Sequence, residues 1–144
     1  MKKFLLFFFC SFFLIMNVQA SSTSARSYVL MDVDSGMVLA SWNSSEELLI
    51  ASTTKIMTCM IVLENASLKD TITVGDEVLS MYGTNIYIEV GEVLTVKDLL
   101  YGLMLRSGND AAITLAVHTL GEEKFIEKMN EKAKELGMKN THFQ

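Results

Sequence analysis

Residues 50–58, with the sequence IASTTKIMT, place Ser52 three residues ahead of Lys55 at a predicted helix start. Residues three apart on a helix share a face, so the Lys55 amine can lie beside the Ser52 hydroxyl. A serine hydroxyl is a poor nucleophile at neutral pH until a neighbouring base accepts its proton. The spacing therefore predicts an activated serine with Lys55 as its base.

Lys55 can act as a base only when it is neutral, and an unperturbed lysine has a pKa of about 10.4. Burial with few compensating charges lowers a lysine pKa by several units. The residues after Lys55 predict a helix that ends near Asn65 and is apolar on almost every side, which favours a buried setting. Its apolar residues are Ile56, Met57, Cys59, Met60, Ile61, Val62 and Leu63.

The spacing of Ser52 and Lys55 alone leaves a second interpretation open, because serine is also a common N-cap residue of helices. A second segment decides between the two. Residues 99–112 read LLYGLMLRSGNDAA, and Ser107-Gly108-Asn109 interrupts their helical pattern. By itself this tripeptide could be a helix stop followed by a cap. Side chains at a break between helices can also point into a cleft.

The two segments, in this order, closely resemble the active-site segments of the serine D-Ala-D-Ala carboxypeptidases, the low-molecular-mass penicillin-binding proteins. The resemblance runs from about Ser27 to Gln144. It implies that Ser52 attacks the penultimate D-Ala carbonyl of a peptidoglycan pentapeptide and that Lys55 accepts the serine proton. Ser107 would relay a proton to the leaving amine, and Asn109 would bind the substrate backbone and help hold Lys55. β-Lactam antibiotics would be covalent inhibitors, and no cofactor is implied.

Residues 1–20 are typical of a secretory signal peptide. Lys2 and Lys3 precede an apolar run over residues 4–18, and Val18-Gln19-Ala20 fits a small-residue cleavage site. A run of about 15 residues is short of the roughly 20 that a membrane span needs, so we expect cleavage rather than a retained anchor. The sequence therefore predicts an exported protein on the extracytoplasmic face of the membrane or in the cell wall, with possible peripheral membrane association.

Composition limits the partners of residues 21–144. The signal holds two of the 12 basic and none of the 17 acidic residues, which leaves ten against 17 and a net charge of −7. This acidic balance argues against a nucleic-acid partner. Cys59 is the single cysteine after the signal, and we expect a buried, inert thiol. His118 and His142 share no metal-ligand spacing with other candidates, so no metal site is predicted.

The pattern along the chain predicts an α+β fold. Two strand-like runs flank Asp34-Ser35-Gly36, where a glycine in so short a connection indicates a hairpin. The first run is almost continuously apolar, which predicts a sheet covered on both faces. A mostly helical segment follows, and the resemblance implies a β-lactamase/transpeptidase-like domain. The predicted elements are strands 28–33, 37–42 and 71–74, a helical turn 76–81, and helices 52–65, 95–105, 110–120 and 122–136.

Local signals set the bounds of the later helices. Thr95 and Asp98 have the spacing of a capping box at the start of helix 95–105. Gly121 ends helix 110–120, and the charges along one face of residues 122–136 predict an amphipathic helix.

A third motif of the family, Lys-Thr-Gly, does not occur in these 144 residues, and 35 residues follow Asn109. In the family this strand binds the terminal carboxylate and supplies the second oxyanion donor. We therefore expect residues 21–144 to form a C-terminally truncated, incomplete catalytic domain with impaired activity. Two other interpretations stay open: a non-catalytic penicillin-binding or cell-wall-binding fragment, and a β-lactamase-like hydrolase.

Overall fold

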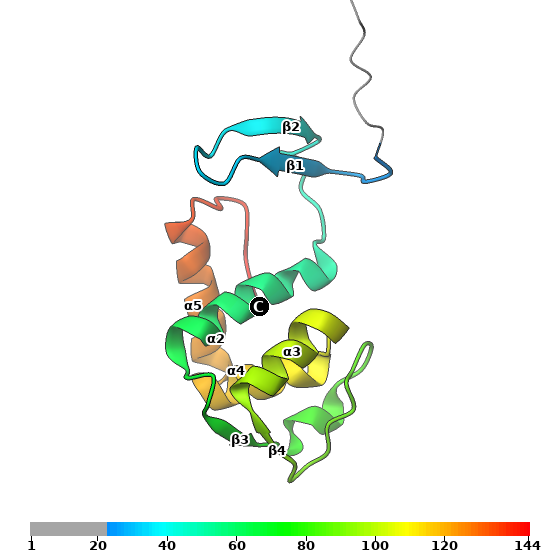
Figure 1. The fold of residues 1–144 in the computed structure, drawn as a ribbon, viewed down its shortest axis with the longest axis vertical. Helices are drawn as coiled ribbons and strands as arrows, with labels where there is room; N and C mark the ends of the chain where they lie inside the picture. The colour runs from blue at the N-terminus through cyan, green and yellow to red at the C-terminus, as the bar shows by residue number, and fades with distance from the viewer. Residues whose placement is uncertain (1–22) are drawn as a thin grey trace, which may run out of the picture. The chain divides into compact units, whose positions relative to one another are not determined.

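The computed structural model describes residues 23–144 (Figure 1). The predicted signal peptide, residues 1–20, lies outside the described residues. Contacts divide the chain into one unit that ends at Glu46 and a second unit from Glu47 to Gln144. Each unit is described by itself below.

The first unit is the predicted antiparallel hairpin of β1 (Tyr28–Met31) and β2 (Val38–Trp42). Both strands are shorter than predicted, because a register shift at Met31 ends the regular pairing early. The turn closes with Gly36 at φ +69°, a conformation that glycine adopts without steric cost. The Gly36 N–H donates to the Asp32 carbonyl at 2.9 Å. The turn chemistry that predicted the hairpin is therefore confirmed.

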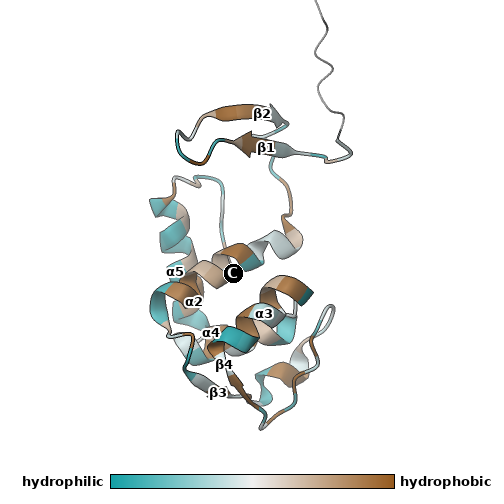
Figure 2. Ribbon diagram, viewed as in Figure 1, coloured by the Kyte–Doolittle hydropathy of each residue, from teal (hydrophilic) through white to brown (hydrophobic). Residues whose placement is uncertain are grey.

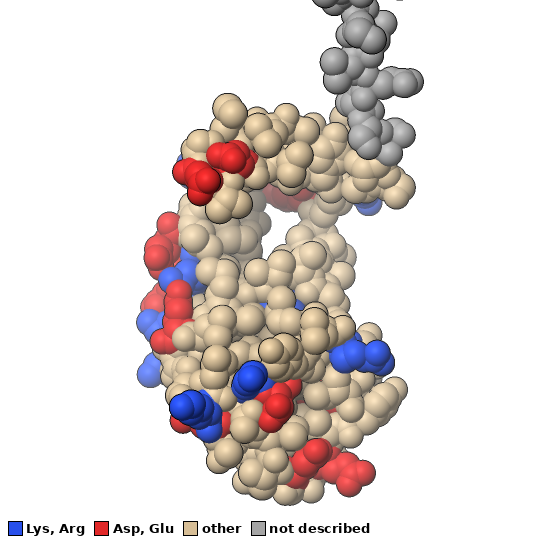
Figure 3. Space-filling view, viewed as in Figure 1, with Lys and Arg blue, Asp and Glu red and all other residues tan. Residues whose placement is uncertain are grey.

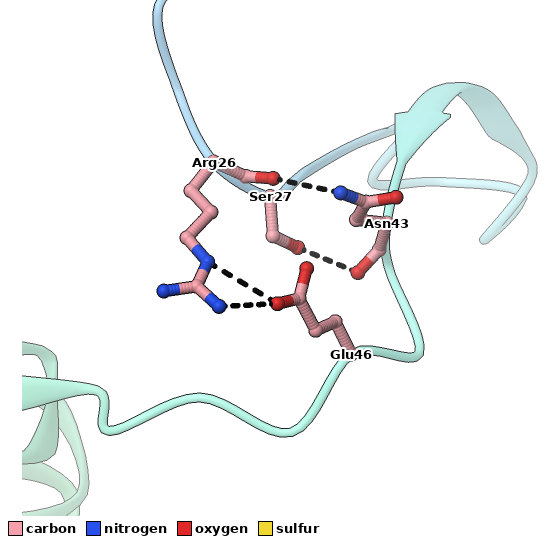
Figure 4. Close-up of polar contacts among 4 residues, drawn as sticks. All are labelled: Arg26, Ser27, Asn43 and Glu46. Atoms are coloured by element: carbon pink, nitrogen blue, oxygen red, sulfur yellow. Dashed lines mark hydrogen bonds and ion pairs between the residues drawn. The ribbon is translucent and has the colours of Figure 1, made fainter.

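The open end of the hairpin is held by four polar residues (Figure 4). The Arg26 Nη2 atom lies 2.6 Å from Glu46 Oε1. The Ser27 hydroxyl donates to the Asn43 carbonyl at 2.9 Å, and the Asn43 amide donates to the Arg26 carbonyl at 3.3 Å. Exposed ion pairs of this kind contribute little to stability, so these contacts mainly set where the hairpin ends.

The predicted cover on both faces of the first strand is wrong for the described residues. Every residue of β2 is exposed, and so is every residue of β1 except Tyr28. Among the described residues this sheet consists of β1 and β2 alone, and nothing covers either face of it closely enough to bury the side chains.

The second unit is mostly helical. It begins with a single 3-10 turn, η1, that leads into helix α2, and it contains a two-stranded pair, β3 and β4, in which Ile72 lies opposite Leu94. The short strand β4 was not predicted. The elements are η1 (Ala51–Thr53), α2 (Thr54–Asn65), β3 (Thr71–Thr73), η2 (Asp76–Ser80), β4 (Val93–Thr95), α3 (Val96–Arg106), α4 (Asn109–Thr119) and α5 (Glu122–Glu135).

The core of this unit lies where α4 contacts α2, α3 and α5. Helix α3 begins with the predicted capping box: Asp98 N–H donates to Thr95 Oγ1 at 3.1 Å, and Thr95 N–H donates to Asp98 Oδ2 at 3.3 Å. The largest fully buried side chains of the core are those of Ile61, Val62, Leu99, Leu103, Leu115 and Phe125.

Helix α2 is less buried than predicted. One face, which includes Ile61 and Val62, packs into the core. On the other side Ile56 is 55% exposed and Leu63 is 52% exposed. Figure 2 shows how apolar this helix is compared with α5. The apolar run therefore does not by itself decide burial, because only one face of α2 meets the other helices.

Helix α5 is amphipathic, as predicted. Its buried residues are Phe125, Met129 and Ala133. Charges of both signs lie on the side of the molecule where α5 runs (Figure 3). On this helix Lys128 and Glu131 form an ion pair at 2.6 Å. The helix ends before Gly137, which has φ +73°. Among the described residues no helix is both long enough and apolar enough to cross a membrane.

Thr114 on α4 is fully buried, and its Oγ1 atom has no hydrogen-bond partner within the described part of the chain. A buried unsatisfied hydroxyl costs about 1–3 kcal/mol. We expect Thr114→Val to raise the free energy of unfolding by about 1 kcal/mol in urea denaturation, because a methyl group replaces the hydroxyl. Thr114→Ser is the matched control: it keeps the hydroxyl, loses the methyl group and should lower stability. A Thr114→Val variant less stable than the parent would contradict this prediction.

Candidate active site

Ser52 lies in the middle of η1, one residue before the N-cap of α2, and its side chain is exposed. The N-cap positions of η1 and α2 are Ile50 and Thr53, and neither makes a side-chain capping bond. Ser52 therefore does not serve as the cap of either helix. The preceding residue, Ala51, has φ +45°, so the backbone turns through a left-handed conformation immediately before Ser52.

Ser107 and Ser52 are 55 residues apart in the sequence, and the Ser107 hydroxyl donates a hydrogen bond to Ser52 Oγ at 2.9 Å. Ser107 is the C-cap of α3 and has φ +58°, a left-handed conformation unusual for a residue with a side chain. This backbone turn ends α3, and the hydroxyl is directed to η1 rather than along the helix. The predicted break between two helices is therefore present, and it faces Ser52.

Lys55 lies one turn after Ser52 and is half-buried. Its Nζ donates to Asn109 Oδ1 at 2.7 Å. Burial lowers the pKa of Lys55 below the ordinary lysine value, because desolvation penalises the ammonium form. The direction of this shift is the one that a lysine base requires.

Asn109 is the first residue of α4, and both ends of its amide have partners. Its Oδ1 accepts from Lys55, and its Nδ2 donates to the Tyr82 carbonyl at 2.7 Å. Because a carbonyl can only accept, the Tyr82 contact defines which end of the Asn109 amide faces Lys55.

All four predicted site residues therefore meet at one place. They are joined as two pairs, Ser52 with Ser107 and Lys55 with Asn109. Among the described residues no hydrogen bond joins Ser52 directly to Lys55. The arrangement supplies an exposed hydroxyl near a helix start, a second hydroxyl in contact with it and an amine whose pKa is lowered by burial. These are the parts that nucleophilic catalysis by serine needs.

Two further groups at this site, the Tyr82 carbonyl and Asp110, were not predicted from the sequence. A backbone carbonyl leaves no sequence pattern. The sequence predicts Asp110 only as the start of a helix, yet it is 3% exposed and accepts hydrogen bonds from a distant loop. An acidic residue directly after Asn109 was the one available signal.

Two other candidate residues lie apart from these pairs. Cys59 is half-buried, and burial raises the pKa of its thiol. His118 on α4 contacts Glu77 of η2, with 3.2 Å between Nε2 and Oε1. Within residues 23–144 no group of three or more His, Cys, Asp or Glu side chains is arranged to hold a metal ion.

The left-handed backbone of Ser107 leads to a prediction about stability. Glycine adopts this conformation freely, whereas alanine keeps the steric cost. We expect Ser107→Gly to be about 1 kcal/mol more stable to urea than Ser107→Ala. Both variants lose the hydroxyl that contacts Ser52, so the comparison isolates the backbone. Equal stability of the two variants would contradict the prediction.

Comparison with known proteins reveals extensive similarity. A family model described as D-alanyl-D-alanine carboxypeptidase, Peptidase S11, matches residues 15–144. The chain is 45% identical over 125 residues to D-alanyl-D-alanine carboxypeptidase DacF of Bacillus subtilis, covering 83% of this chain and 32% of that relative. It is 41% identical over 139 residues to DacC of Escherichia coli, covering 88% and 35%.

The fold is similar to solved structures as well. The D-alanyl-D-alanine carboxypeptidase of Mycobacterium tuberculosis superimposes with a TM-score of 0.80 at 34% identity, covering 89% of this chain and 48% of that one. The chain spans about a third of the length of the curated relatives it matches.

Proposed function

The chain belongs to the D-alanyl-D-alanine carboxypeptidase family, and from this premise we propose that it carries the nucleophile and the base of a serine-type D-Ala-D-Ala carboxypeptidase. The family and the α+β, transpeptidase-like fold predicted from sequence are thereby confirmed. The proposal for the activity rests on one observation, the geometry of two hydrogen-bonded pairs. The Oγ atoms of Ser52 and Ser107 lie 2.9 Å apart, and Lys55, one turn after Ser52, donates to Asn109 Oδ1 at 2.7 Å.

In the proposed reaction, Ser52 Oγ attacks the penultimate D-Ala carbonyl of a peptidoglycan stem peptide that ends in D-Ala-D-Ala. The neutral Lys55 amine accepts the serine proton. The peptide bond breaks, the terminal D-Ala leaves, and its amine receives a proton through Ser107. The product is an ester of Ser52, which water then hydrolyses to regenerate the hydroxyl.

Charge develops on the attacked carbonyl oxygen, and the position of Ser52 suits that charge. Ser52 lies just before α2, where free backbone N–H groups and the positive end of the helix dipole favour an oxyanion. The backbone N–H of Ser52 would be one donor. A β-lactam presents a strained amide to the same hydroxyl, so the same steps would leave the opened drug attached to Ser52.

Asn109 supports the proposed base. Its Oδ1 accepts from Lys55 Nζ and would keep this contact after Lys55 has taken the serine proton. In the same proposal Asn109 also donates to the substrate backbone. Its Nδ2 group must then either leave the Tyr82 carbonyl or use one N–H for the Tyr82 carbonyl and the other for the substrate.

Mass spectrometry of the intact protein and of its proteolytic digest, after reaction with benzylpenicillin, tests this proposal. We expect an adduct of the full drug mass on the peptide that contains Ser52. No adduct, or an adduct on another residue, would refute the assignment. Release of D-Ala from a peptide that ends in D-Ala-D-Ala then separates a carboxypeptidase from a protein that only traps the drug.

We also propose that residues 1–20 are a signal peptide and that residues 21–144 belong to the catalytic domain. Peptidoglycan lies outside the cytoplasmic membrane, so an enzyme that acts on it must be exported. Determination of the N-terminal residue of the exported protein tests the boundary: Ser21 is expected. A chain that keeps Met1 would argue against cleavage.

A further inference from the structure

The connection between η2 and β4 contains a loop, residues 82–88, that has no helix or strand of its own. Its backbone is held by one carboxylate. Asp110 Oδ2 accepts from the N–H groups of Tyr87 at 2.7 Å, Ile86 at 3.1 Å and Ile88 at 3.2 Å. Its Oδ1 accepts from the Ile86 N–H at 3.0 Å and from the Ala111 N–H at 2.9 Å. A buried carboxylate that receives several N–H groups is satisfied without a cation.

The start of α4 holds the same loop at three further points. The Asp110 N–H donates to Asn85 Oδ1 at 3.2 Å. The Asn109 N–H donates to the Thr84 carbonyl at 2.7 Å, and the Asn109 side chain donates to the Tyr82 carbonyl at 2.7 Å. Most residues of the loop therefore make a hydrogen bond to residue 109 or residue 110.

The glycine between Ser107 and Asn109 makes room for this arrangement. A Cβ atom at Gly108 would lie 2.8 Å from Asp110 Oδ1 and 3.1 Å from Ile86 Cγ2. The loop is also held in a conformation it would not adopt freely, because Tyr87 has φ +62°. Contacts with Asp110 offset that strain.

We propose that Asp110 is a positioning residue that orients the Asn109 amide through this loop. By holding residues 86–88, Asp110 places the Tyr82 carbonyl against Asn109 Nδ2. That contact turns Asn109 Oδ1 toward Lys55 Nζ. The relevance to catalysis rests on the proposed function, whereas the link from Asp110 to Asn109 does not.

Asp110→Asn in the full chain tests the link. The side chain keeps its shape but exchanges one acceptor oxygen for an NH2 group that faces backbone donors. Hydrogen bonds to a charged acceptor contribute about 1.5–3 kcal/mol, so we expect the amides of Ile86, Tyr87 and Ile88 to exchange about 10- to 100-fold faster with solvent. The side-chain amide signal of Asn109 in an NMR spectrum should move toward that of a free asparagine. β-Lactam labelling should slow by about tenfold or more.

Asp98→Asn is the matched control. Asp98 is also a carboxylate at a helix start, and it accepts from the Thr95 backbone. This variant should lower stability but leave the Asn109 signal and the exchange of residues 86–88 unchanged. A shift of the Asn109 signal as large as that in Asp110→Asn would show a general loosening and overturn the proposal.

Three further outcomes are decisive. An Asp110→Asn variant with an unchanged Asn109 signal overturns the proposal. If that variant does not fold, Asn85→Ala removes the acceptor of the Asp110 N–H together with the donor to the Met81 carbonyl. It should move the same amides and the Asn109 signal in the same direction by less, and no movement overturns the proposal. A parent chain that no β-lactam labels refutes the proposed function, while the Asn109 signal still tests the role of Asp110.

Discussion

Replacing Ser52 by alanine is expected to abolish covalent labelling of the chain by a fluorescent β-lactam. The drug can remain attached only through an ester to an activated hydroxyl, and Ser52→Ala removes the oxygen that forms this bond. The folded state should be almost unchanged, because the Ser52 side chain is exposed and caps neither η1 nor α2. Gel fluorescence after denaturation measures the label, and circular dichroism measures the fold.

Ser67→Ala is the matched control for this experiment. Ser67 is exposed and follows the C-terminal end of α2, whereas Ser52 precedes its start. Twelve helical residues separate the two sites, which is about 18 Å along the helix axis. The Ser67→Ala variant should label like the parent. Equal labelling of Ser52→Ala and the parent would refute the assignment of Ser52 as the nucleophile.

Replacing Lys55 by methionine is expected to slow the same labelling by about 100- to 10,000-fold, the usual contribution of a general base. Methionine keeps much of the length of the side chain and removes the amine. Lys55→Arg should be impaired to a similar degree, because an arginine stays protonated and accepts no proton from Ser52. An active Lys55→Arg variant would mean that a positive charge, rather than a base, is needed at this position.

The pH dependence of labelling tests the same role. Burial lowers the pKa of Lys55, so the neutral amine forms at a lower pH than in an ordinary lysine. In the parent chain the labelling rate should therefore rise with pH, and the rise should be centred below the ordinary lysine pKa. The residual rate of Lys55→Met should lack this rise. The same rise in both proteins would assign the titration to another group.

The local features of the fold were predictable because each depends on neighbours in the sequence. The Asp34-Ser35-Gly36 turn predicted the hairpin, and the Thr95 and Asp98 spacing predicted the start of α3. The breaks at Ser107 and Gly121 likewise separated the three long helices α3, α4 and α5. The roles of Ser52, Lys55, Ser107 and Asn109 were assigned by resemblance and remain predictions that the variants above test.

Features that depend on distant contacts were predicted poorly. The strand β4 has three residues and too little pattern to detect; its partner, β3, lies about 20 residues earlier. The burial of α2 was overestimated, because an apolar run does not show which of its faces another helix will cover.

By itself, the sequence determined the family, the hairpin, the order of the helices and the four candidate site residues, since these follow from short motifs and their order. The tertiary structure alone decided that Ser107 contacts Ser52, that Lys55 contacts Asn109 and that Asp110 holds the loop at residues 82–88. The physical reason is that such contacts form between segments 22 to 55 residues apart, and only the packing of α2, α3 and α4 against one another brings them within hydrogen-bond distance.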